Sequence, residues 1–189
     1  MTIILASASP RRRELLEQVG CEFSIITSDV EEDNTRQMMP AKLAVSHAQA
    51  KALAVASTLS RQSVVIGADT IVVFGGKVYG KPADGADARR MLLNLAGKDH
   101  QVITGIAVVK GENLWTDFAV TAVRLADLTA KQIEAYVNTG EPMDKAGAYA
   151  IQGKGALFVE SIQGSYSNVV GLPLKTLADL LKKAGVSLL

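Results

Sequence analysis

Apolar runs with the character of buried strands alternate with helical patterns along the chain. Runs rich in β-branched residues predict strands, and these are Thr2–Ala6, Phe23–Thr27, Ser63–Phe74, Val78–Tyr79, Gln101–Lys110, Leu114–Ala126 and Leu157–Ile162. Helical spacing and end signals predict helices from Pro10 to Gly20, Pro40 to about Ser60, about Ala86 to Ala96, Thr129 to Gly140, and over Leu174–Ala184. This mixture of helices and hairpins predicts an α/β fold with a mixed sheet rather than a purely parallel one.

Turn and capping residues mark several of the expected boundaries. Ser9-Pro10 places an N-cap serine before a proline at its favoured first helical position. Gly75-Gly76 and Gly111-Glu112-Asn113 each predict a hairpin turn. Thr129 and Gln132 form the pattern of a capping box. A polar acidic loop is expected between the second strand and the second helix.

Length and charge narrow the class of protein. The 189 residues are 48% apolar, which is enough for one domain over residues 1–189 with a sizeable core. The 20 basic and 19 acidic residues leave a net charge of +1, which argues against a nucleic-acid-binding module and against disorder. Any anion site must therefore be local.

The single cysteine, Cys21, excludes an intrachain disulfide and a multi-cysteine metal cluster. Arg11–Arg13 follow the short apolar start, the reverse of the order in a signal peptide. The longest apolar run, Val64–Phe74, is interrupted by Asp69 and is too short to span a bilayer. We expect a soluble, cytoplasmic protein that does not bind a membrane.

The segment from Ser7 to Arg12 is the first candidate for chemistry. A strand that runs into a helix start directs backbone N–H groups and the positive end of the helix dipole at one spot. The hydroxyls of Ser7 and Ser9 and the two guanidinium groups of Arg11 and Arg12 would complete a phosphate cradle. The alternative is a helix cap with solvated arginines, but cations beside a helix N-terminus are unfavourable without an anion, which favours phosphate.

Asp69 is the second candidate, because it lies inside an apolar strand. A carboxylate there is costly unless a metal, a cation or hydrogen bonds satisfy it. An ion-paired structural aspartate is the alternative. The β-branched residues on both sides make an exposed strand end a poor explanation and favour a functional role.

Two further segments carry weaker indications. Gly75–Lys81 nearly matches a P-loop, but Pro82 replaces the Ser/Thr that would bind magnesium, so a P-loop is rejected and Lys81 alone could be a solvated turn lysine. In the stretch 144–153, small residues allow close backbone approach to a ligand and Gln152 could read a base edge, although a structural loop is equally compatible. Acidic residues 29–33 could supply a metal ligand or a solvated face.

Several common chemistries have no support. The chain lacks the HExxH, GxSxG, GxGxxG and CxxC motifs. His47 and His100 have no clear nucleophile partner, so a Ser-His-Asp or Cys-His mechanism is unsupported.

These segments, in this order, resemble the Maf family of nucleoside triphosphate pyrophosphatases. The matching pieces are SASPRR at 7–12, DVEE at 29–32, Lys51 within QAKA, GADTIVV at 67–73, GKP at 80–82, HQVITG at 100–105, DKAGAYAIQG at 144–153 and NVVGLPL at 168–174. The resemblance implies a Maf/ITPase-like fold, with a mixed elongated sheet flanked by helices and two lobes around a central cleft. It also implies divalent-metal-dependent hydrolysis of a nucleoside triphosphate to the monophosphate and pyrophosphate.

The resemblance also implies roles for individual residues. Asp69 resembles the catalytic carboxylate, as proton acceptor or metal ligand, and Glu32 an acidic partner of metal or water. The phosphate-binding set would be Ser9, Arg12, Lys51 and Lys81. Arg11, Thr70 and Gln152 match the residue types of the branch that acts on dTTP and UTP, whereas Ala150 stands where that branch more often has glycine.

From this resemblance we expect a dTTP/UTP pyrophosphatase that uses Mg²⁺, Mn²⁺ or Co²⁺. We also expect a homodimer. Removal of non-canonical nucleotides is an open possibility for its role. Two alternatives remain open at this point. One is a nucleotide-binding regulator of septum formation without turnover, and the other is a pyrophosphatase of the 7-methyl-GTP type. A carboxylate beside phosphates favours turnover, because simple binding does not need one.

Overall fold

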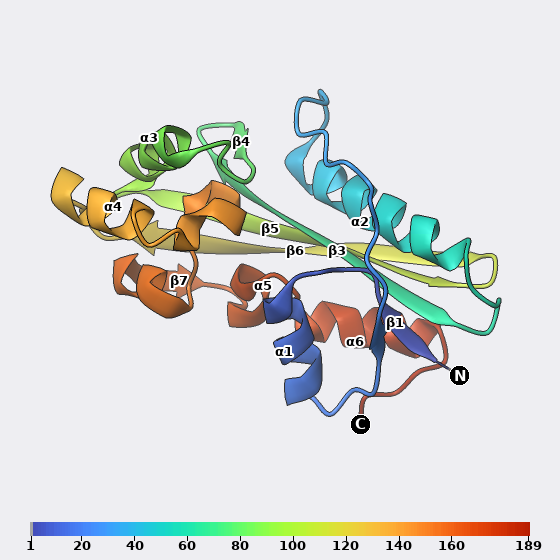
Figure 1. Ribbon diagram of the computed structural model, residues 1–189. Coiled ribbons are helices and arrows are strands. Elements are labelled where there is room, and N and C mark those ends of the chain that lie inside the picture. The colour runs from blue at the N-terminus through green and yellow to red at the C-terminus, as the bar shows by residue number, and fades with distance from the viewer. Residues whose placement is uncertain (1) are drawn as a thin grey trace. The chain divides into compact units, whose positions relative to one another are not determined.

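The computed structural model describes residues 2–189, whose helices and strands alternate along the chain (Figure 1). In chain order the elements are β1 (Ile3–Leu5), α1 (Pro10–Gln18), β2 (Ser24–Ile25), α2 (Pro40–Ala56), β3 (Val64–Phe74), β4 (Lys77–Tyr79), α3 (Gly85–Leu95), β5 (Asp99–Lys110), β6 (Asn113–Leu125), α4 (Ala130–Val137), β7 (Val159–Gln163), α5 (Tyr166–Val170) and α6 (Leu174–Lys183). Three short 3-10 turns, Glu141–Asp144, Ala146–Ala148 and Gly153–Phe158, lie between α4 and β7.

The strands of the described residues form one seven-stranded mixed sheet, which confirms the predicted fold class. Its order is β2-β1-β3-β5-β6-β7, with β4 paired to β3. Strand β1 is parallel to β2 and to β3, whereas the β3–β4 and β6–β7 pairs are antiparallel. The register that pairs Ile3 with Val64 and Leu5 with Ile66 places β1 beside the first three residues of β3, so that β1 ends three residues before Asp69 in this register.

The chain divides into two compact units, which correspond to the two lobes expected from the sequence. The first comprises residues 1–70, 104–119 and 171–189, of which residue 1 lies outside the described part. In this unit α2 covers one face of the sheet, and α1 and α6 lie against the other (Figure 1). The α2 face is packed with small and β-branched side chains from α2, β1, β3 and β5. The central cleft stays a prediction.

The second unit comprises residues 71–103 and 120–170. Its core is formed by apolar side chains of α3, α4 and the strand segments that belong to this unit. Tyr136 of α4 and Phe158 pack edge to face, with ring centroids 4.9 Å apart. This core supports the irregular stretch between α4 and β7, which contains the predicted segment 144–153.

Most predicted boundaries agree with the structure, and the differences have local causes. The capping box at Thr129 and Gln132 is present, and Gly75-Gly76 turns β3 into β4. Helix α2 ends at Ala56 rather than near Ser60, because the hydroxyls of Ser57 and Thr58 bond back to carbonyl groups of the last turn. Helix α5 was not predicted, because it is short and lies in a glycine-rich stretch.

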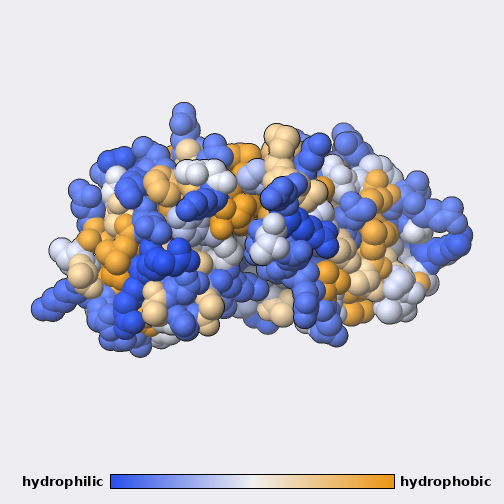
Figure 2. Space-filling view, turned by 90° about the horizontal axis from the view of Figure 1, so that it is seen from above, coloured by the Kyte–Doolittle hydropathy of each residue, from blue (hydrophilic) through white to orange (hydrophobic). Residues whose placement is uncertain are grey.

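Hydrophilic residues cover most of the face drawn in Figure 2, and apolar residues are exposed there in small separate groups. Among residues 2–189, none of the helices has both the length and the apolar character required to cross a lipid bilayer.

Candidate active site

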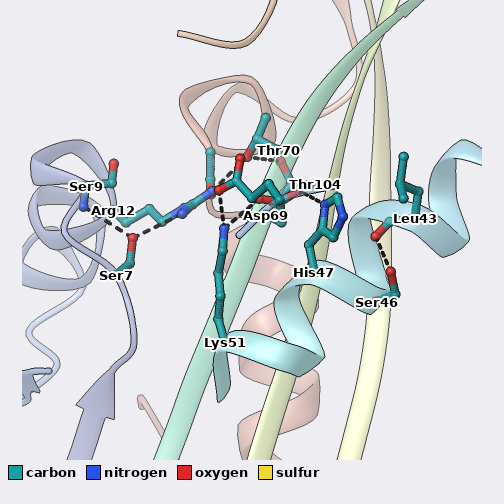
Figure 3. A network of polar contacts seen from close by, with 12 residues as sticks. Ser7, Ser9, Arg12, Leu43, Ser46, His47, Lys51, Asp69, Thr70 and Thr104 are labelled. Atoms are coloured by element: carbon teal, nitrogen blue, oxygen red, sulfur yellow. Dashed lines mark hydrogen bonds and ion pairs between the residues drawn. The ribbon is translucent and has the colours of Figure 1, made fainter. Parts of the chain in front are cut away.

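Asp69 of β3 is the centre of a buried polar network in the first unit (Figure 3). Only 3% of the residue is exposed. Its Oδ1 atom lies 2.7 Å from Nζ of Lys51, and its Oδ2 atom lies 3.1 Å from Nδ1 of His47. The cost of burying the carboxylate is thus offset by two basic side chains of one helix.

Two glycines allow α2 to come close enough for these contacts. A Cβ on Gly67 of β3 would lie 2.2 Å from the carbonyl oxygen of Ala48, and a Cβ on Gly105 of β5 would lie 2.4 Å from the backbone of α2. Because the helix backbone rests directly on the strands, His47 and Lys51, one helical turn apart, reach Asp69 from the same face. The small residues around Asp69 are therefore part of how the site is built.

Lys51 connects Asp69 to the acidic loop. Its Nζ atom lies 2.6 Å from Oε1 of Glu32, and Lys51 itself is almost fully buried. The ammonium group of Lys51 therefore contacts two carboxylates, those of Asp69 and Glu32. The loop around Glu32 lacks regular structure, as predicted, and Glu32 is half-buried while Glu31 is exposed.

The charges in this network shift the pKa values of its members. Burial alone raises the pKa of Asp69, but the hydrogen bond from His47 and the charge and hydrogen bond of Lys51 outweigh it, so the net shift is downward. The hydrogen bond to Asp69 in turn raises the pKa of His47. Asp69 is therefore held as a carboxylate, able to accept a proton or to bind a cation.

Hydrogen bonds to three neutral oxygen atoms orient the guanidinium group of Arg12, on the first turn of α1. Its Nε donates to the carbonyl of Gly171 at 2.8 Å, and its two terminal nitrogens donate to Ser7 Oγ and Thr70 Oγ1, each at 3.1 Å. Thr70 Oγ1 also lies 2.9 Å from Thr104 Oγ1. Burial lowers the pKa of Arg12, and the charge of Asp69 opposes that shift. The guanidinium group is thus fixed next to the residue that follows Asp69.

Ser9 and Arg11 are the other residues predicted to bind phosphate at the start of α1. Ser9 occupies the N-cap position, but its hydroxyl makes no capping hydrogen bond. Its backbone N–H donates to Ser7 Oγ at 3.2 Å instead. Arg11 is half-buried on the first turn, and Arg13 pairs with Glu17.

Lys81 and Gln152 belong to the second unit, where their two segments are joined. The backbone N–H of Gly147 donates to the carbonyl of Gly80 at 3.0 Å, next to Lys81. Lys81 is exposed and Gln152 is half-buried. Asp144 and Lys145 form an ion pair. The structure therefore brings the GKP and DKAGAYAIQG segments together.

A family model described as Maf-like protein matches residues 2–184. The chain belongs to the Maf family. The Maf chain is 51% identical over 189 residues to a protein of Desulforamulus reducens named dTTP/UTP pyrophosphatase, and the alignment covers 98% of each. A protein of Symbiobacterium thermophilum with the same name is 50% identical over 183 residues, with 97% of this chain and 94% of the relative covered.

A solved structure shares the fold of this Maf protein at low sequence identity. The Ham1 protein of Staphylococcus aureus superposes with a TM-score of 0.51 and 15% identity, and the alignment covers 97% of this chain and all of that one. The sheet order confirms the expected α/β fold with a mixed sheet, and this likeness shows that the Ham1 protein shares it.

Sequence reasoning missed the partners of both histidines in this Maf protein. His47 contacts Asp69, and His100 contacts the hydroxyl of Tyr149. The spacing of His47 and Lys51 by four residues on an alanine-rich helix was a usable indication, since residues so spaced share a face. Nothing in the sequence pattern linked His100 to Tyr149, which lies far along the chain.

Proposed function

We propose that this Maf protein hydrolyses dTTP and UTP to the nucleoside monophosphate and pyrophosphate. The observation that carries the proposal is the buried carboxylate of Asp69, held ionised by His47 and Lys51. The names of relatives about 50% identical over nearly the full length support the choice of substrate. We treat the two units as one functional domain over residues 1–189.

The triphosphate needs cations, because it carries several negative charges. We assign phosphate binding to Ser9, Arg12, Lys51 and Lys81. The directed guanidinium of Arg12 suits bidentate contact with phosphate oxygens, while the two lysines act as point charges. Arg11, on the same turn, belongs to the residues proposed to set specificity.

The carboxylates fit a divalent cation, although the described residues hold no group of three or more His, Cys, Asp or Glu side chains placed around one point. Asp69 and Glu32 converge on the ammonium group of Lys51, where a cation is already favoured. Mg²⁺ and Mn²⁺ accept one or two protein carboxylates and take their other ligands from water and substrate phosphates, and Co²⁺ can take similar ligands. When bound, such an ion supplies positive charge against the phosphate oxygens.

We assign to Asp69 the acceptance of a proton from the attacking water, because its carboxylate is held ionised. The water oxygen bonds to the α-phosphorus, and its proton passes to a carboxylate oxygen of Asp69. The bond from that phosphorus to the oxygen shared with the β-phosphate breaks, and its electron pair leaves with pyrophosphate. Arg12 and Lys81 stabilise the charge on that leaving group.

Base selection is assigned to Arg11, Thr70 and Gln152. An amide can both donate and accept, as the shared O4 and N3–H edge of uracil and thymine requires, whereas cytosine presents another pattern. Thr70 accepts from Arg12 in the structure, so its hydroxyl also orients a phosphate-binding group. Losing one buried hydrogen bond costs about 1–3 kcal/mol, so CTP should be about tenfold to a hundredfold poorer.

The remaining expectations are a cytoplasmic location, a homodimer and the absence of nucleic-acid or membrane partners. Strand β6 pairs with β7 only from Ala122 to Leu125, so its preceding residues offer an edge that a second copy could cover. Sedimentation that finds only a monomer at micromolar concentration would contradict the homodimer.

The decisive test of function separates products by chromatography after incubation of the protein with dTTP and Mg²⁺, Mn²⁺ or Co²⁺. We expect dTMP and pyrophosphate, with kcat/KM highest for dTTP and UTP in a panel that includes CTP, purine triphosphates and 7-methyl-GTP. Asp69→Asn should bind nucleotide but lose nearly all turnover, while Asp179→Asn on the exposed face of α6 should behave as wild type.

Three outcomes would overturn the proposal. Orthophosphate and dTDP as the only products would mean cleavage at the γ-phosphate. Binding without turnover would favour the regulator of septum formation. A preference for 7-methyl-GTP or for purines would place the protein in the other branch.

A further inference from the structure

The chain segment that carries Gln152 is irregular but firmly held. Gly147 and Ala148 both have positive φ, at 70° and 61°, and Ala148 is fully buried. A non-glycine residue rarely adopts this conformation, and it persists only where surrounding contacts impose it. The contacts on either side of Gln152 are therefore informative.

On the N-terminal side, Tyr149 is tied to β5 of the same unit. Its hydroxyl lies 2.6 Å from Nε2 of His100, and the two rings meet edge to face with centroids 5.3 Å apart. Burial keeps the pKa of His100 low, at about 4, and raises the pKa of Tyr149. Both side chains are therefore neutral, and a single proton is shared in the hydrogen bond between Nε2 and the tyrosine oxygen.

On the C-terminal side, Glu141 binds the backbone just past Gln152. Its Oε2 accepts from the N–H of Lys154 at 3.1 Å, and its Oε1 accepts from the N–H of Gly155 at 2.9 Å. Oε1 also accepts from the hydroxyl of Tyr136 at 3.0 Å. A carboxylate that accepts two backbone N–H groups and a hydroxyl holds its segment strongly, because charge-assisted hydrogen bonds are the stronger kind.

Gly153 shows how tightly the turn wraps this carboxylate. It has φ of +66°, and a Cβ there would lie 2.9 Å from Oε2 of Glu141. Between the two attachment points, Tyr149 and Lys154, only four residues remain, and Gln152 is one of them. The freedom of the Gln152 backbone is thus limited from both sides.

We propose that the His100–Tyr149 pair and Glu141 are positioning residues for base selection, because together they fix the backbone from which Gln152 reads the base. The inference rests on the proposed function, in which Gln152 contacts the uracil or thymine edge. A side chain that discriminates by hydrogen bonds must be held within roughly 0.5 Å of its productive position, so its support is part of the specificity.

The experiment compares kcat/KM for dTTP and for CTP in the wild type, Tyr149→Phe, Glu141→Gln and Gln152→Ala. Tyr149→Phe and Glu141→Gln should each lower the dTTP-to-CTP ratio by roughly threefold to tenfold, mainly through weaker dTTP use. In the Gln152→Ala background, neither change should lower that ratio further, since both act through Gln152. Controls are Tyr166→Phe at a half-exposed tyrosine and Glu160→Gln at an exposed ion pair of the same unit, and both should retain the wild-type ratio.

A ratio within twofold of wild type in both positioning variants would overturn the inference, as would an equal further fall in the Gln152→Ala background. If Tyr149→Phe fails to fold, Glu141→Gln, which keeps one acceptor oxygen, decides the question. Failure of the proposed function is seen separately, as a wild type that does not prefer dTTP to CTP.

Discussion

The buried His100 predicts a specific loss of stability at acidic pH. In the folded protein, burial lowers the pKa of His100 from 6.5 to about 4. The residue is 4% exposed, and Nε2 lies 2.6 Å from the Tyr149 hydroxyl. The unfolded chain takes up a proton on His100 near its ordinary pKa, while the folded protein does not.

The sign and size of the effect follow from this difference. Above about pH 7.5 both states carry a mostly neutral imidazole, so nearly the full stability is present. As the pH falls towards the folded-state pKa of about 4, the unfolded state gains a proton and the free energy of unfolding decreases. Between about pH 7.5 and about pH 5 this one residue should remove about 2 kcal/mol.

Urea unfolding at a series of pH values measures this contribution. The decrease between the two pH values should be about 2 kcal/mol larger for the wild type than for His100→Gln, whose amide is polar but does not titrate. Tyr149→Phe is the matched control, because it keeps a buried imidazole and should retain the wild-type decrease. Equal decreases in wild type and His100→Gln, or a folded-state pKa of His100 near 6.5 by NMR, would refute the reasoning.

Two further variants test how the Asp69 network is built. Gly67→Ala should destabilise the protein by at least about 2 kcal/mol in urea unfolding, because the new Cβ would lie 2.2 Å from the carbonyl oxygen of Ala48. Its control is Gly85→Ala, whose Cβ would be in ordinary contact at 3.4 Å. That variant should change the free energy of unfolding by less than about 1 kcal/mol. Arg12→Lys should lower kcat/KM for dTTP roughly tenfold to a hundredfold, since an ammonium group cannot make the three directed bonds of the guanidinium, whereas Arg13→Lys should have little effect. Full activity in Arg12→Lys, or a Gly67→Ala protein as stable as wild type, would contradict this account.

Much of the fold could be predicted because the hydrophobic pattern and the turn residues agree. Asp69 could be found for the same reason, since a carboxylate inside a β-branched run conflicts with its surroundings unless partners are present. The strand is interpretable from local sequence alone. The partners of Asp69 cannot be predicted from local sequence alone, because they depend on how α2 crosses β3 at Gly67.

The contacts that escaped prediction are those made across long stretches of chain. His100 and Tyr149 are 49 residues apart, and Arg12 and Gly171 are 159 apart. No periodicity links such pairs, since each is formed only when separate elements pack together. Helix α5 was not predicted for another reason, because its five residues are too few to show a helical pattern.

In the proposed reaction, water attacks the α-phosphorus of dTTP and Asp69 receives one of its protons. The most direct measurement is hydrolysis of dTTP in ¹⁸O-labelled water, with the products separated and weighed by mass spectrometry. We expect one labelled oxygen in dTMP, none in pyrophosphate, and no labelled product from Asp69→Asn over the same time. Label in pyrophosphate, label in orthophosphate, or labelled dTMP formed at the wild-type rate by Asp69→Asn would contradict it.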